Sequence, residues 1–225
     1  MTRITLEETW PVLHAYLSRE APDIARSFLA PIQAAELQET QQQRLQPLLP
    51  LLALLNGQVR FPLHCLYPGM ILMSAPHILG ELDEFQALVE EHELLGYTER
   101  DYPCQPPSTI RNNAWNTSWV PFATDFAGSF IAVDIDPGEE GQLGQVIAFG
   151  VDHETRYVLS NSLEEFFAHL LRLFQQQVIS VGQGVQFQQT MIWRFPSASS
   201  FFHKPDEIYR LYYANFNTST SFRRN

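Results

Sequence analysis

Four acidic residues near the middle of this chain carry the strongest suggestion of chemistry. They are Asp134, Asp136, Glu139 and Glu140. An EF-hand loop that began at Asp134 would require Asp or Asn at its fifth position, Gly at its sixth and Glu at its twelfth. The residues found there are Gly138, Glu139 and Gln145. We therefore interpret the acids as an acidic turn after a strand, and we expect no metal and no cofactor.

Three glycines in the same stretch do not match a phosphate-binding loop. Gly138, Gly141 and Gly144 are not followed by Lys-Ser or Lys-Thr, and a strand rather than a helix is expected after them. The neighbouring acids would also repel phosphate. We predict that these are turn glycines with positive φ.

The remaining nucleophiles and bases do not form a catalytic set. No histidine pair has the H-E-x-x-H spacing, and no G-x-S-x-G sequence occurs. Cys65 and Cys104 lack a C-x-x-C partner, so both are expected to be structural thiols. A metal-assisted hydrolase that uses Asp134 and Asp136 is the enzymatic alternative, and we predict a protein that is not an enzyme.

Charge and composition restrict the class of partner. The chain has 225 residues, 45% of them hydrophobic, and a formal net charge of −11. This balance argues against nucleic acid or an anionic membrane as partner, and it permits a basic protein. The acidity is local, because residues 81–165 contain 17 acids and three bases.

An acidic surface in this middle segment could bind a basic protein with fast and salt-sensitive association. The alternative is that these acids are ordinary solubilising turn residues. Trp115 lies in an aromatic cluster with Trp119 and Phe122, which could serve an interface or simple packing. The candidate partner-binding residues are Asp134, Asp136, Glu139, Glu140, Asp152, Glu154 and Trp115.

Helices are expected first, then strands, then another helix. The order favours an α+β fold. Capping-box patterns begin helices at Thr5 and Ser162. Further helices are expected at 33–46, 48–55 and from Ser74 to Glu93. Predicted strands lie at 119–124, 130–135, 145–149 and 156–159, with an edge strand at 187–195 and a short helix at 205–213.

No targeting or membrane segment is expected. The first ten residues contain Glu7 and Glu8 and lack the apolar run of a secretory signal. The longest apolar stretch, Leu48–Leu55, contains Pro50 and is far shorter than the roughly 20 residues that span a bilayer. We expect a cytoplasmic protein.

An Asn56-Gly57 pair, Trp119 and Pro121 in one strand, Asp125, a Pro137-Gly138 turn and a Gly144-Gln145 strand start follow one another along the chain. These motifs, in this order, resemble the SUKH superfamily, and within it the fungal cell-wall-assembly regulator and killer-toxin-resistance branch. The resemblance covers roughly residues 6–177, which gives a SUKH-like domain at 1–177. Residues 178–225 would be a C-terminal extension packed on or extending the same domain. The signature residues are Asn56, Gly57, Trp119, Pro121, Asp125, Pro137, Gly138, Gly144 and Gln145.

The resemblance implies a mixed or antiparallel sheet flanked by helices, with no catalytic residues. Bacterial members resemble immunity proteins that bind and neutralise toxins, whereas fungal members resemble scaffolds in cell-wall-synthesis signalling. The chain lacks the long disordered flanks expected of the fungal scaffold. We therefore predict a bacterial immunity-type protein, with a regulatory scaffold of cell-wall-synthesis signalling as the alternative.

Overall fold

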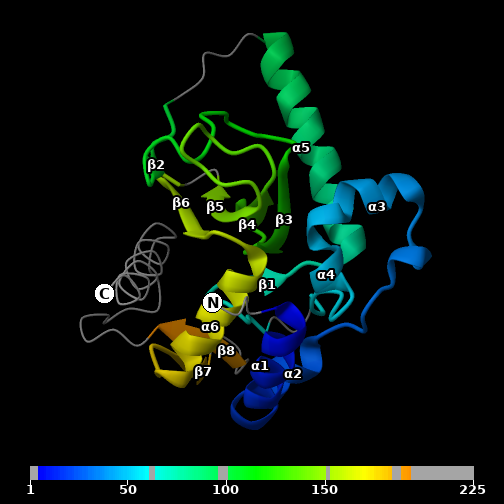
Figure 1. Cartoon of the computed structure of the whole chain (residues 1–225), viewed down its shortest axis with the longest axis vertical. Helices are drawn as coiled ribbons and strands as arrows, with labels where there is room; N and C mark the ends of the chain where they lie inside the picture. Colours follow the sequence, from blue (N-terminus) through cyan, green and yellow to red (C-terminus); the bar gives the residue numbers. More distant parts are fainter. Residues whose placement is uncertain (1–4, 61–63, 96–100, 151–152, 184–188, 194–225) are drawn as a thin grey trace.

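A computed structural model describes residues 5–60, 64–95, 101–150, 153–183 and 189–193 (Figure 1). Short helices come first along the chain, and the strands of the main sheet follow. The helical elements are α1 (Leu6–Glu20), α2 (Pro22–Ser27), η1 (Ala34–Glu36), α3 (Glu39–Leu45), η2 (Gln46–Leu48), α4 (Leu49–Leu52), α5 (Ala75–Leu95) and α6 (Leu163–Gln175). The strands are β1 (Ile71–Leu72), β2 (Cys104–Gln105), β3 (Trp119–Thr124), β4 (Ser129–Asp134), β5 (Gln145–Gly150), β6 (Arg156–Ser160), β7 (Ile179–Gln183) and β8 (Gln189–Trp193).

The main sheet has six strands in the order β1-β3-β4-β5-β6-β2. Neighbours from β1 to β6 pair antiparallel, and β2 pairs parallel with β6. The predicted α+β fold with a mixed sheet is confirmed. Every residue of β3, β4 and β6 is buried. Because successive side chains of a strand point to opposite faces, both faces of the sheet must be covered.

One face of the sheet is covered by α6. The ring of Phe122 on β3 lies 5.5 Å from that of Phe166 and 6.4 Å from that of Phe167. The helix begins after Ser162 as predicted, and the Ser162 hydroxyl accepts from the Glu165 N–H at 3.3 Å. Only this half of the predicted capping box is present, because the Glu165 carboxylate accepts from Asn161 Nδ2 instead. This face is held by apolar packing of an amphipathic helix.

The other face is covered by α5 and by residues 106–118, which follow β2 and which we call the covering loop. Phe130 and Phe149 are register partners on β4 and β5. Their rings lie 5.2 and 5.9 Å from the ring of Phe85 on α5. Trp115 of the covering loop lies 6.3 Å from Phe149. Irregular backbone therefore shares this face with a helix.

The N-terminal helices pack on α6 and on the start of the sheet. The predicted capping box at Thr5 is present, with Thr5 and Glu8 each accepting from the other's N–H. Tyr16 of α1 stacks on Phe174 of α6 at 5.7 Å. The prediction of one helix at 33–46 is wrong, because Gln38 is extended and separates η1 from α3. The Gln38 N–H donates to the side chain of Gln41 in the first turn of α3.

The chain continues after α6 into a separate two-stranded sheet, β7-β8. The predicted strand at 187–195 is present as β8, paired antiparallel with β7. This hairpin contacts α6 and α2. The predicted helix at 205–213 lies outside the described residues. Within the part of the chain that the structure describes, no helix has the length and hydropathy needed to cross a bilayer.

Candidate functional site

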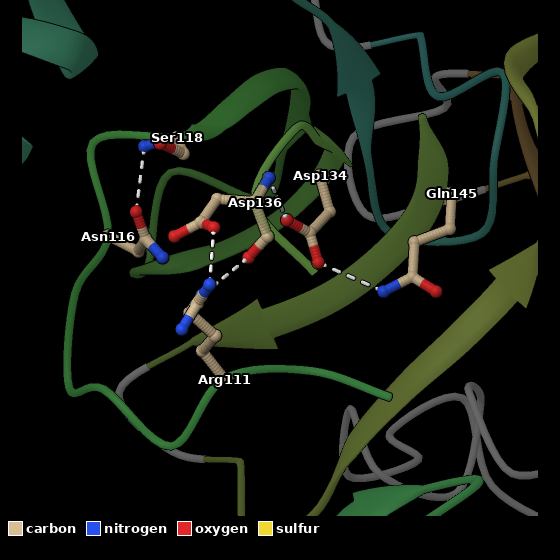
Figure 2. Close-up of polar contacts among 6 residues, drawn as sticks. All are labelled: Arg111, Asn116, Ser118, Asp134, Asp136 and Gln145. Carbon is tan, nitrogen blue, oxygen red and sulfur yellow. Dashed lines mark hydrogen bonds and ion pairs between the residues drawn. The ribbon is translucent and has the colours of Figure 1, made fainter. Parts of the chain in front are cut away.

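The acidic turn consists of Asp134, the last residue of β4, and the β4–β5 connection at residues 135–144, and it is built around Asp134. This carboxylate is 0% exposed. It accepts from the Asp136 N–H at 3.0 Å and from Gln145 Nε2 at 2.9 Å (Figure 2). Burial raises the pKa of Asp134, and the two hydrogen bonds oppose that rise. The prediction that Asp134 faces a partner is therefore wrong, because its carboxylate shapes the turn from inside.

Gln145 joins the acidic turn to the covering loop. Its Nε2 also donates to the carbonyl of Thr109 at 2.7 Å. Its Oε1 accepts from the Gln142 N–H at 3.1 Å, inside the turn. One buried amide therefore connects Asp134, the turn backbone and the covering loop.

The glycines of the acidic turn allow its backbone to lie against the covering loop. A Cβ on Gly138 would lie 2.4 Å from the Ser108 carbonyl oxygen, and one on Gly141 would lie 2.1 Å from that of Thr109. The Gly138 N–H donates to the Thr109 carbonyl at 3.0 Å. Only Gly144 of the three has a positive φ, +84°. The positive-φ prediction is thus wrong for Gly138 and Gly141, which are needed for close backbone approach.

An ion pair fastens the outer edge of the same contact. Arg111 Nη2 lies 2.7 Å from Asp136 Oδ1, and Arg111 Nε donates to the Asp136 carbonyl at 3.2 Å (Figure 2). Both side chains are about half exposed. Asp136 is therefore partly neutralised within the molecule, whereas Glu139 and Glu140 are exposed at the tip of the turn.

Two exposed apolar residues accompany these acids, and the sequence analysis missed them. Ile135 is 41% exposed and Leu143 is 70% exposed. They flank the base of the turn, where the Gly144 N–H donates to the Asp134 carbonyl at 2.8 Å. The sequence does contain a sign of this exposure, because Ile135 and Leu143 are single apolar residues within an otherwise polar, Gly-rich stretch.

The remaining partner-binding candidates do not join this surface. Glu154 is exposed but follows the far end of β5, roughly 17 Å along the strand from the acidic turn. Asp152 lies outside the described residues. The ring of Trp115 contacts Phe85 at 5.2 Å, which fits the packing alternative. The single acidic face that the sequence suggested is thus divided between two ends of the sheet.

A buried arginine, also missed, holds the covering loop down. Arg156 of β6 donates to the carbonyls of Arg111 and Ala114 at 3.2 and 3.1 Å. Its guanidinium carbon lies 4.1 Å from the ring centroid of Tyr102 and 4.7 Å from that of Trp119. The signal available in the sequence was a charged residue at the start of an otherwise apolar strand.

Other signature residues have structural tasks. Asn56 Oδ1 accepts from the Ala75 N–H at 2.7 Å and so caps α5. Gly57 has φ +75°, and a Cβ there would lie 2.4 Å from the backbone of Met73. Asp125 Oδ1 accepts from two backbone N–H groups of the β3–β4 turn, at 2.7 and 2.9 Å. Pro121 is a buried residue of β3 beside a register shift, and Pro137 is a half-buried residue of the acidic turn.

The family model described as the SMI1 / KNR4 family (SUKH-1) matches residues 51–169, more than half of the chain. This segment contains the main sheet, the covering loop, the acidic turn and the first half of α6. The chain belongs to the SMI1/KNR4 family (SUKH-1).

Similar SMI1/KNR4 proteins include named fungal regulators. A 63-residue segment is 44% identical to "Cell wall biosynthesis/cell cycle regulator smi1" of Schizosaccharomyces pombe, covering 28% of this chain and 12% of that protein. A "Glucan synthesis regulatory protein" of Neurospora crassa is 40% identical over 63 residues, 28% of this chain and 12% of that protein. "KNR4/SMI1 homolog 2" of Debaryomyces hansenii is 43% identical over 61 residues, 27% and 10% of the two chains. The matches thus span about a tenth of these relatives' lengths.

The S. pombe and N. crassa relatives are named as regulators, not as enzymes. Within the described residues, no group of three or more His, Cys, Asp or Glu side chains could hold a metal ion. The names favour the regulatory alternative over the immunity-type prediction.

Proposed function

We propose that this chain is a non-catalytic protein-binding domain that regulates cell-wall or glucan synthesis, and that the acidic turn contacts its partner. The observation that carries the proposal is the exposure of Ile135 and Leu143 beside Glu139 and Glu140. Family membership and the relatives' names support the regulatory part of the proposal.

The construction of the turn suits a binding surface. Ordering a loop during association costs free energy, and a loop held in place beforehand avoids that cost. Asp134, Gln145 and the Gly138 backbone already fix this turn. Two apolar side chains can then anchor a partner while the exposed carboxylates select a basic surface.

The proposed partner is a protein, not a nucleic acid or a membrane surface. The net charge of −11 opposes both of the latter. We place the protein in the cytoplasm as part of the same proposal.

A domain exchange in S. pombe tests the regulatory function. The segment of smi1 that matches this chain would be replaced by residues 1–225, and this fusion would take the place of the native regulator. Wall glucan content and cell division would then be measured. We expect the exchange to restore both, and the double substitution Ile135→Asp with Leu143→Asp to abolish restoration.

The matched control is Val12→Asp, because Val12 is a 50% exposed apolar residue on α1. Restoration by the double variant at the level of the unsubstituted chain would remove the acidic turn from the proposal. Failure of the unsubstituted chain, with the protein folded and expressed, would contradict the regulatory function itself.

Toxin neutralisation remains a prediction with its own test. Co-expression of the chain with a basic nuclease toxin in bacteria would show growth protection if the chain is an immunity protein. Protection by the chain, together with failure of the domain exchange, would replace the regulatory proposal.

A further inference from the structure

The second half of α5 extends past the body of the molecule. Among the residues that the structure describes, the packed core includes Phe85 of α5 and no later residue of that helix. Leu95 is 53% exposed and Leu94 is 85% exposed. Figure 1 shows this end of α5 at one extreme of the longest axis, beyond the sheet.

Three apolar side chains of this half, together with His92, follow a coiled-coil spacing. Phe85, Leu88, His92 and Leu95 recur at intervals of three and four residues, which places them in one line along the helix. Leu88 and His92 are half-buried and Leu95 is exposed, so the line emerges gradually from the core. Leu94 lies beside the line and serves as its natural control.

The charge around this line has one sign. Between Asp83 and Leu95 the helix carries five acids and no Lys or Arg. Glu84 and Glu91 are exposed and flank the line directly, at the positions where coiled coils form interhelical ion pairs. An antiparallel or parallel helix placed here would need basic flanking residues to avoid repulsion.

We propose that residues 84–95 of α5 bind a basic amphipathic helix of a partner protein. The partner's apolar stripe packs on Leu88, His92 and Leu95, and its Lys or Arg residues face Glu84 and Glu91. A second copy of this chain is disfavoured, because its own α5 presents the same acids. The surface is distinct from the acidic turn and does not depend on the proposed function.

A synthetic helix pair tests the proposal with the whole chain. The first probe is a fluorescein-labelled 21-residue peptide with Leu at the a and d heptad positions and Lys at e and g, and the second has Glu in place of Lys. Fluorescence anisotropy measures both. We expect the Lys peptide to bind at least about tenfold more tightly than the Glu peptide, with an affinity that falls as salt is added.

Three variants assign the binding to this face. Leu95→Asp should weaken binding of the Lys peptide about tenfold or more, and Leu94→Asp less than about twofold. The double substitution Glu84→Lys with Glu91→Lys should reverse the preference between the two peptides. The double variant of Ile135 and Leu143 should bind the Lys peptide normally, which separates this proposal from the acidic turn.

Several outcomes would overturn the proposal. They are equal binding of the two peptides, no binding of the Lys peptide at about 1 mM, or equal losses in the Leu94 and Leu95 variants. Sedimentation that shows a dimer of the chain, dissociated by Leu95→Asp, would assign the face to a second copy instead. Circular dichroism confirms that each variant retains its helix content, which is expected because all the substituted side chains are exposed.

Discussion

The two faces of the main sheet are covered by different means. On one face, α6 places Phe166 and Phe167 against Phe122, and apolar packing holds the contact. On the other, the covering loop lies over the sheet and is fastened by the buried side chains of Arg156 and Gln145. A helix satisfies its own backbone hydrogen bonds, but a loop requires partners for each buried carbonyl.

This difference separates the size of an effect from its location. Losing a buried ring under the helix lowers the stability of the whole domain, whereas losing a buried donor under the loop also releases the loop locally. The acidic turn adjoins the loop-covered face, so its shape depends on the buried hydrogen bonds that hold the covering loop. We therefore expect the two faces to respond differently to substitution.

The largest effect is expected on the helix-covered face. Phe166→Ala removes a buried ring and leaves a cavity, so the free energy of unfolding should fall by about 4 kcal/mol. Urea denaturation followed by circular dichroism measures this loss. The covering loop should keep its place, so trypsin should cut after Arg111 no faster in the folded variant.

Arg156→Met should cost slightly less stability and act locally. Losing two charged hydrogen bonds and leaving two carbonyls without this donor should cost about 3 kcal/mol. Trypsin cleavage after Arg111 should be faster under native conditions, because the loop is released. Cleavage at the parent rate would contradict the role assigned to Arg156, and Arg156→Lys should give an intermediate rate because Lys lacks the planar fork.

Acid should destabilise the protein through buried histidines. Burial lowers the pKa of His169 on α6 to about 3, and the nearby Arg172 adds to the shift. Burial likewise lowers the pKa of His153 to about 4. The unfolded chain therefore binds protons first, so stability is fully present above pH ~6.5 and is lost as the pH falls toward these values.

The substitution His169→Gln tests this pH dependence. Between pH 7 and pH 4.5 the variant should lose about 2 kcal/mol less stability than the parent. Asp134 acts in the opposite direction, because its raised pKa lets the folded protein take up a proton first. Urea denaturation at several pH values gives the comparison, and parallel curves for parent and variant would contradict the assignment.

The smallest effect is expected at the outer edge of the loop-covered face. Arg111→Gln removes an ion pair whose two side chains are about half exposed, so the loss should be under about 1 kcal/mol. Added salt should reduce the difference from the parent. A loss as large as that of Arg156→Met would show that the edge, not the buried arginine, fastens the covering loop.

Much of the fold could be predicted from local patterns. The capped start of α1, the amphipathic α6 and the bounds of β3 follow from nearest-neighbour signals along the chain. The acidic turn was recognised by its residues, but its internal organisation was not. Nothing adjacent in sequence indicates that Asp134 turns inward to Gln145, or that Gly138 meets the backbone of Ser108.

The sequence by itself determined the order of helices and strands, most of the longer elements and the segment with excess acid, because periodicity, caps and charge are local properties. Only the tertiary structure decided which acids share a surface. The direction of β5 places Glu154 at the opposite end of the sheet from Glu139, and burial removes Asp134 from the surface. The exposure of Leu94 and Leu95 at the end of α5 is likewise a tertiary fact, since the spacing of a helix alone does not distinguish a core helix from an exposed one.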